Sequence, residues 1–182
     1  MTQVTHIELP VDFSVVRCRR VNPFHWALLK ALRSFVPGAR PNFETLAQRL
    51  RIIEPSFLTR AWVEIRELKG ADDDDFAQAR LSALGEAALE THSFVLGEPE
   101  LHSQKLYFKK ADAEPVPGAS FEVSAPRNLK AKPEWGDKFG AEEIADALAK
   151  QTPGQALRRD ERIQSFTLRW QEAQEVHVTL AR

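Results

Sequence analysis

Apolar residues recur at helical spacing in the first half of the chain. The Asn22-Pro23 pair starts a first helix that Pro37-Gly38 ends, with apolar positions at Trp26, Leu29, Leu32 and Phe35. The same spacing predicts three more helices, over residues 43–50, 55–68 and 84–91. A β-branched stretch, residues 4–21, precedes them and predicts one or two short strands or an extended arm.

The second half has a different pattern. After Gly97, prolines separate short apolar runs, which predicts strands joined by loops, with one short helix over residues 141–150. Near the end, Phe166 to Trp170 and Val176 to Leu180 alternate with polar residues across the spacer 171–174, as a β-hairpin would. A strand is also expected over Phe76 to Ser82, after the four aspartates 72–75.

These patterns predict an α+β fold. We expect an N-terminal strand arm (residues 1–21), a helical domain (22–97) and a smaller β-rich region (98–182) with one short helix and a C-terminal hairpin. Of the 182 residues, 43% are hydrophobic and 28% are charged, which is typical of a globular protein. No apolar run is long enough to span a membrane, so we expect a cytoplasmic protein.

The helical domain carries a resemblance to a known class of protein. The stretches LAQRLRIIEPSFLTRAWVEIREL (Leu46 to Leu68) and ARLSALGEAALE (Ala79 to Glu90) resemble the helix-turn-helix and the following strand and helix of bacterial winged-helix regulators of the MarR and PadR type. The resemblance covers residues 22–91. It implies an N-terminal winged helix-turn-helix whose third helix enters the major groove of double-stranded DNA.

The resemblance also implies site residues. Base edges would be contacted by Ser56, Thr59 and Arg60, and phosphates by Arg40, Arg49, Arg51 and Lys69. Charge supports this locally, because residues 1–70 hold 11 Lys and Arg against 6 Asp and Glu, although the whole chain carries only −1. The function expected is non-enzymatic DNA binding, as a regulator or as a DNA-binding subunit.

Several residues depart from the DNA-binding pattern. Arg51 stands after the second helix where glycine is favoured, and Glu64 and Glu67 add negative charge to the third helix. The wing tip is the acidic run 72–75, and residues 71–102 hold 1 basic against 8 acidic residues, which opposes binding to phosphates.

A protein-docking module, or the N-terminal part of a larger multi-subunit assembly, is therefore the alternative. Its contact residues would be Phe57 and Val63 on the third helix. A further expectation is a homo-oligomer, or edge pairing with another chain, through the C-terminal strand with Val176, Val178 and Leu180.

Catalytic and metal chemistry are not expected. The five histidines lack the spacing of known zinc motifs, Cys18 is the single cysteine, and no glycine-rich phosphate loop occurs. We therefore expect no catalytic residue, no metal and no cofactor.

Overall fold

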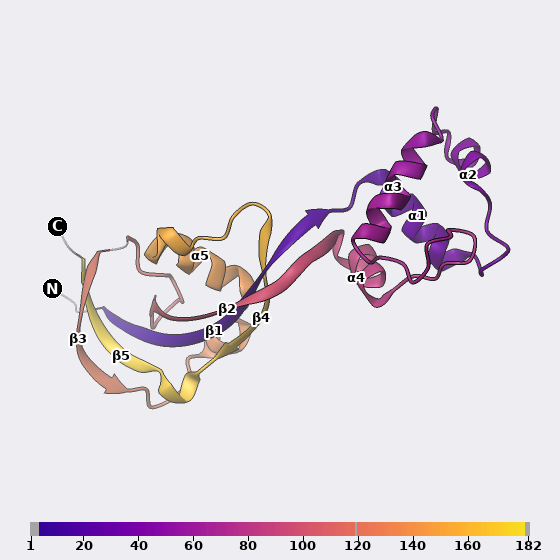
Figure 1. Cartoon of the computed structure of the whole chain (residues 1–182). Coiled ribbons are helices and arrows are strands. Elements are labelled where there is room, and N and C mark those ends of the chain that lie inside the picture. Colours follow the sequence, from indigo (N-terminus) through magenta and orange to yellow (C-terminus); the bar gives the residue numbers. More distant parts are fainter. Residues whose placement is uncertain (1–3, 119, 181–182) are drawn as a thin grey trace. The chain divides into compact units, whose positions relative to one another are not determined.

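The computed structural model describes residues 4–118 and 120–180, and these form an α+β fold. Five helices and a five-stranded antiparallel sheet follow in the order β1 (Thr5–Arg20), α1 (Pro23–Ser34), α2 (Phe43–Leu50), α3 (Ser56–Glu67), α4 (Ala83–Thr91), β2 (Ser93–Lys109), β3 (Phe121–Asn128), α5 (Ala141–Gln151), β4 (Glu161–Leu168) and β5 (Gln174–Leu180). Short 3₁₀ turns, η1 (Glu134–Lys138), η2 (Pro153–Gln155) and η3 (Trp170–Glu172), lie between the later elements. Figure 1 traces them along the chain.

The chain divides into two compact units. One, called here the helical unit, is Cys18–Gly97; the other, the sheet unit, is formed by Met1–Arg17 and Glu98–Arg182. The expected N-terminal arm over residues 1–21 is a single 16-residue strand of the sheet, β1. Its alternate residues Ile7, Leu9, Val11 and Phe13 are buried, so hydrophobic burial holds this segment in the sheet.

The sheet unit places α5 on one face of its strands. Ile144, Ala147 and Leu148 of α5 join the buried residues of β1 in one cluster, together with Leu106 and Phe108 of β2. On the other side of β1, Glu8 accepts hydrogen bonds from Lys105 Nζ (2.8 Å) and Tyr107 Oη (2.9 Å). Burial and the neighbouring Glu8 carboxylate both raise the pKa of Tyr107, which keeps its hydroxyl protonated as a donor.

The expected C-terminal hairpin is wrong. Both β4 and β5 pair with β1 rather than with each other: β5 through Thr5 to Glu8, and β4 through Val11 to Arg17. They lie end to end along the same strand, separated by η3, and Arg169 N donates to the Pro10 carbonyl at 3.0 Å in the gap. Because Pro10 has no N–H to donate, the partner strand is interrupted where β1 can offer only an acceptor.

The segment between β4 and β5 contributes to the core instead of forming a hairpin turn. Trp170 at the start of η3 packs edge to face on Trp135, with ring centroids 5.7 Å apart. Trp135 also packs on Phe108 and Phe139. The chain therefore bulges out of the strand to place an indole ring in this cluster, and it does not reverse direction.

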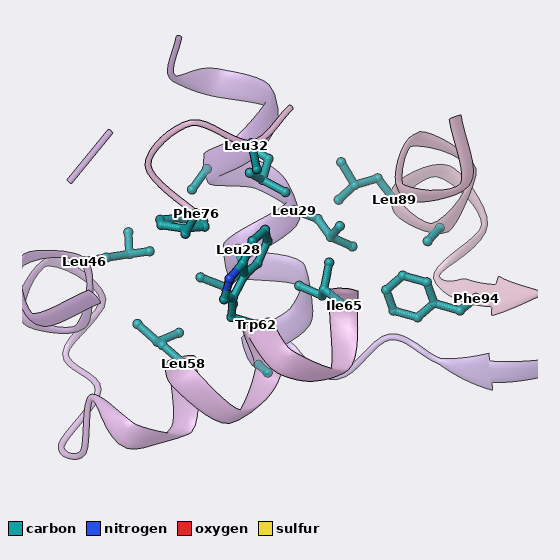
Figure 2. Close-up of a cluster of buried hydrophobic side chains, with 14 of the residues drawn as sticks. Leu28, Leu29, Leu32, Leu46, Leu58, Trp62, Ile65, Phe76, Leu89 and Phe94 are labelled. Carbon is teal, nitrogen blue, oxygen red and sulfur yellow. The ribbon is translucent and has the colours of Figure 1, made fainter. Parts of the chain in front are cut away.

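The helical unit contains the four helices that apolar spacing predicts. Asn22 and Asn42 start α1 and α2, and each side chain accepts a backbone N–H three residues on, at 2.8 Å. The core lies mainly between α1 and α3 (Figure 2): Leu28, Leu29 and Leu32 of α1 belong to one cluster with Leu58, Trp62 and Ile65 of α3. Leu46, Phe76, Leu89 and Phe94 complete the cluster.

Candidate nucleic-acid interface

The chain between α2 and α3 turns at Arg51. Arg51 ends α2 in the left-handed conformation (φ 56°, ψ 37°), and the N–H of Ile52 returns to the Ala47 carbonyl at 2.8 Å. Residues 51–55 then lead into α3 at Ser56. Arg51 thus takes the backbone shape for which glycine is favoured, at a conformational cost that glycine would not incur.

The two faces of α3 differ sharply in burial. Leu58, Ala61, Trp62 and Ile65 face the core and are at most 5% exposed. The opposite stripe, at i, i+4, i+7 and i+11, is exposed and holds Ser56, Arg60, Val63 and Glu67, with Thr59 beside it. The residues expected to contact base edges, Ser56, Thr59 and Arg60, therefore all lie on the solvent face of the helix.

Four of the basic residues expected to contact phosphates or bases are exposed and, in the described part of the chain, are not paired with acidic side chains. Within residues 4–118 and 120–180, the side chains of Arg49, Arg51, Arg60 and Lys69 make no ion pair or hydrogen bond. Other basic residues of the helical unit are paired with acids: Arg19 with Glu64, Arg33 with Glu86 and Arg66 with Asp74. The cations available to an external anion thus include four of the five that the sequence analysis assigns to DNA contacts.

Arg40 does not belong to this surface, and its expected phosphate contact is wrong. The side chain is buried, with the residue only 8% exposed, and its guanidinium lies over the Phe76 ring at 5.1 Å. It donates hydrogen bonds to the carbonyls of Phe76 and Phe35, the latter at 3.0 Å. Burial lowers the pKa of Arg40, partly opposed by Asp72. Arg40 thus joins the loop after α1 to the loop after α3 and presents no charge to solvent.

Glu64 is turned away from the exposed stripe of α3. Its Oε2 accepts a hydrogen bond from Nε2 of the buried His25 at 2.5 Å and lies 3.2 Å from the Arg19 guanidinium. Burial raises the pKa of Glu64, but the hydrogen bond from His25 and the charge of Arg19 outweigh it and leave that pKa below its ordinary value. The negative charge that counted against DNA binding is therefore used inside the helical unit, whereas Glu67 remains exposed.

The acidic run 72–75 lies in a loop that turns at residues 76–78, so the strand expected over Phe76 to Ser82 is wrong. The pairing in this region is a single bridge between Ala71 and Leu81. Carboxylate oxygens of Asp72, Asp73 and Asp75 accept backbone N–H groups of the same loop, at 2.6 to 3.0 Å. Asp74 pairs with Arg66 at 2.7 Å. These aspartates satisfy the loop's own donors, in the manner of Asx turns.

Phe76 explains why the loop does not extend as a strand. Its ring is buried and packs on Phe43 and Trp62, with centroids 4.8 and 5.2 Å apart. Trp62 Nε1 donates to the Asp74 carbonyl at 3.1 Å. The loop is therefore held onto the helices by its middle, and a long projecting wing is absent from this segment.

The residues proposed as partner contacts divide into exposed and buried ones. Val63 is 44% exposed in the middle of the α3 stripe, and Phe57 is 39% exposed but stacks on Phe24. Leu180 is exposed and Val178 is half-buried. Val176 is only 1% exposed, and β5 pairs with β1 through residues 174–177 and with β3 through residues 174–180. Edge pairing through Val176 is thus wrong, because both edges of the strand are already occupied there.

An apolar hollow on α1 and α2 was not predicted from the sequence. Trp26 was expected on the apolar face of the first helix, yet it is 42% exposed beside a hollow of about 390 Å³ that α2 closes with Leu46 and Leu50. Ile53 in the turn before α3 is 95% exposed. The available signal was the excess of apolar residues in residues 50–57, where a turn between helices is usually polar.

Among the described residues, no three His, Cys, Asp or Glu side chains are grouped so as to hold a metal ion. No helix in that part of the chain is long and apolar enough to cross a membrane.

Comparisons of this chain with protein families, with curated proteins and with solved structures give no match.

Proposed function

We propose that the helical unit binds double-stranded DNA through α3, as a non-enzymatic regulator or DNA-binding subunit. The observation that carries the proposal is the set of exposed, uncommitted cations on and around that helix: Arg49 and Arg51 precede it, Arg60 lies on its solvent face and Lys69 follows it. Cations without internal partners are available to replace the counterions of DNA phosphates.

The local architecture supports the same proposal. Three helices, a bridged loop and a fourth helix follow in the order of a winged helix-turn-helix, with a short, acidic wing. Ser56 and Thr59 offer hydroxyl groups on the exposed side of α3, where they would meet base edges in a major groove. The internal pairing of Glu64 and Asp74 reduces the repulsion that their charges would otherwise exert on phosphates.

Salt dependence provides the first test. The anisotropy of a fluorescent random duplex is titrated with the full chain at about 50 and then 200 mM salt. The three remaining phosphate contacts, Arg49, Arg51 and Lys69, predict an affinity loss of roughly fortyfold across that interval. The absence of binding at the lower concentration, or binding that is insensitive to salt, would contradict the proposal.

A matched pair of variants on α3 then locates the site. Arg60→Ala removes an unpaired cation from the exposed stripe, and we expect a loss of about tenfold or more in duplex affinity. Arg66→Ala removes a cation that already pairs with Asp74, and we expect about twofold or less. Equal losses in the two variants would show that duplex binding is not centred on the exposed stripe.

The docking alternative uses the same helix differently, because it needs apolar contact at Val63. Val63→Thr preserves shape while removing apolar surface, so it would weaken a protein contact more than a DNA contact. DNA binding is favoured over protein docking if Val63→Thr keeps its salt-dependent duplex affinity while Arg60→Ala loses it.

A further inference from the structure

The helical unit has an apolar surface that the DNA-binding proposal does not use. The hollow of about 390 Å³ lies between α1 and α2 and is lined almost entirely by apolar side chains, with Lys30 as its one charged lining residue. A second hollow of about 430 Å³, which includes Arg20 and Val21, shares Pro23 and Trp26 with the first. The two hollows adjoin at Pro23 and Trp26, and together they are called the groove.

The groove has large exposed anchors. Trp26 is 42% exposed where the two hollows meet, and Leu50 is 46% exposed at the end of α2. Lys30 Nζ lies 4.9 Å from the Trp26 ring centroid, so the ammonium group lies over the indole ring. Exposed aromatic side chains in a concave apolar surface are typical anchor points for a partner protein.

The charge around the groove indicates which partner would fit. The residues that line the two hollows include two charged side chains, Arg20 and Lys30, which are both basic, and no acidic side chain. An apolar cleft between two helices accommodates an amphipathic helix with anchors at i, i+3, i+4 and i+7. A basic rim favours carboxylates on the partner's outer positions, because complementary charges speed association and exclude cationic competitors.

We propose that this groove, defined by Trp26, Lys30 and Leu50, binds an acidic amphipathic helix from a partner protein. The groove uses α1 and α2, whereas base reading would use the solvent face of α3. Trp26, Lys30 and Leu50 are not among the residues proposed to contact DNA, so the inference goes beyond the DNA-binding proposal.

The test uses the full chain and a defined peptide probe. The probe is a fluorescein-labelled helix of about 18 residues, five turns long, with Leu and Phe on one face and Glu elsewhere. Two control peptides are a scrambled version without an apolar face and a version with Lys in place of Glu. We expect anisotropy binding for the acidic amphipathic peptide, at least about tenfold tighter than for either control.

Two leucines of equal exposure provide the matched variants. Leu50 is 46% exposed in the groove, and Leu84 is 45% exposed on α4, outside it. Leu50→Glu should weaken the acidic peptide by about tenfold or more, and Leu84→Glu by about twofold or less. Lys30→Ala should weaken the acidic peptide without improving the scrambled one. Circular dichroism verifies that each variant remains folded.

Several outcomes would overturn the proposal. These are no binding of the acidic peptide, equal binding of the scrambled or lysine peptide, and equal losses in Leu50→Glu and Leu84→Glu. A self-association in sedimentation that Leu50→Glu abolishes would also overturn it, because the occupant would then be a second copy of this chain.

Discussion

His25 on α1 and Glu64 on α3 are joined by a 2.5 Å hydrogen bond from the imidazole Nε2 to the carboxylate Oε2. The His25 ring is completely buried, and its Nδ1 accepts the backbone N–H of Asn22 at 3.4 Å. The proton must therefore sit on Nε2 in the neutral ring, which directs it at Glu64. One histidine thus ties the start of α1 to the middle of α3, and it fixes the helix that presents the proposed DNA contacts.

Removing the acceptor should destabilise the helical unit. Glu64→Ala leaves the Nε2 hydrogen of a fully buried ring without its partner, so we expect the free energy of unfolding to fall by about 1–3 kcal/mol. Glu67→Ala, on the exposed stripe of the same helix, is the control and should change it by no more than about 0.5 kcal/mol. Urea unfolding measures both. Similar losses in the two variants would argue that the His25–Glu64 bond contributes nothing specific.

The same contact predicts a pH dependence. The pKa of Glu64 in the folded chain is lowered from its ordinary value of 4.5, although burial alone would raise it, because His25 donates to it and Arg19 lies beside it. Its contribution to stability is therefore complete above about pH 4.5 and is lost as the pH falls toward the folded pKa. The difference in unfolding free energy between the unsubstituted chain and Glu64→Gln should shrink from pH 7 to about pH 3. A difference that grows on acidification would contradict this assignment.

The helices could be predicted from local sequence signals. The features that were not predicted depend on contacts between residues far apart in the chain. Asn22 and Asn42 cap helices where sequence alone places them, because a cap needs only its own first turn. The strand register did not follow from local pattern. Alternation located most of β5 but only the last three residues of β4, and the shared partner of both strands is β1, whose paired residues lie 144 to 172 positions earlier in the chain.

Part of the candidate site could likewise be predicted from local sequence pattern, and part of it could not. Helical periodicity placed Ser56 and Arg60 on the exposed face of α3, since the apolar stripe opposite them is visible in the sequence. Arg40 was misplaced because its burial depends on Phe76, a residue 36 positions away that packs into the core from a polar loop. Charge alone does not distinguish a surface arginine from one that bonds to buried carbonyls.

Salt titrations of single variants should count the phosphate contacts. If Arg49 and Lys69 each neutralise one phosphate, Arg49→Ala and Lys69→Ala should each reduce the magnitude of the slope of log affinity against log salt by about 0.9. Arg33→Ala, which removes a cation that lies 3.8 Å from Glu86, should leave the slope close to that of the unsubstituted chain. Unchanged slopes for Arg49→Ala and Lys69→Ala would place these residues outside the DNA interface.

Arg51 should give opposite effects on stability and on binding. Because its φ is 56°, Arg51→Gly relieves the left-handed backbone and should raise the free energy of unfolding by about 0.5–1 kcal/mol. The same change removes a phosphate contact and should weaken duplex binding. Arg49→Gly loses the same charge inside the last turn of α2, so it should lower stability by about 1 kcal/mol. Thermal unfolding and duplex anisotropy on both variants separate the two effects, and a destabilised Arg51→Gly would be inconsistent with the strain assigned to this turn.

Gly85 in α4 marks the closest approach between that helix and the loop after α3. A Cβ at this position would lie 2.2 Å from the Gly70 carbonyl oxygen and 2.7 Å from Leu81 Cδ1, both far inside contact distance. Gly85→Ala should therefore push α4 away from the loop and lower the free energy of unfolding by about 1–3 kcal/mol, despite the better helix propensity of alanine.

Gly154 in the sheet unit provides the matched control for this substitution. No described atom lies within 4 Å of the Cβ that Gly154→Ala would add, so that variant should stay within about 0.5 kcal/mol of the unsubstituted chain. Urea unfolding at neutral pH measures both. If Gly85→Ala is as stable as Gly154→Ala, the backbone of α4 does not pack directly on residue 70, and the helical unit tolerates a wider spacing there than the contact distance implies.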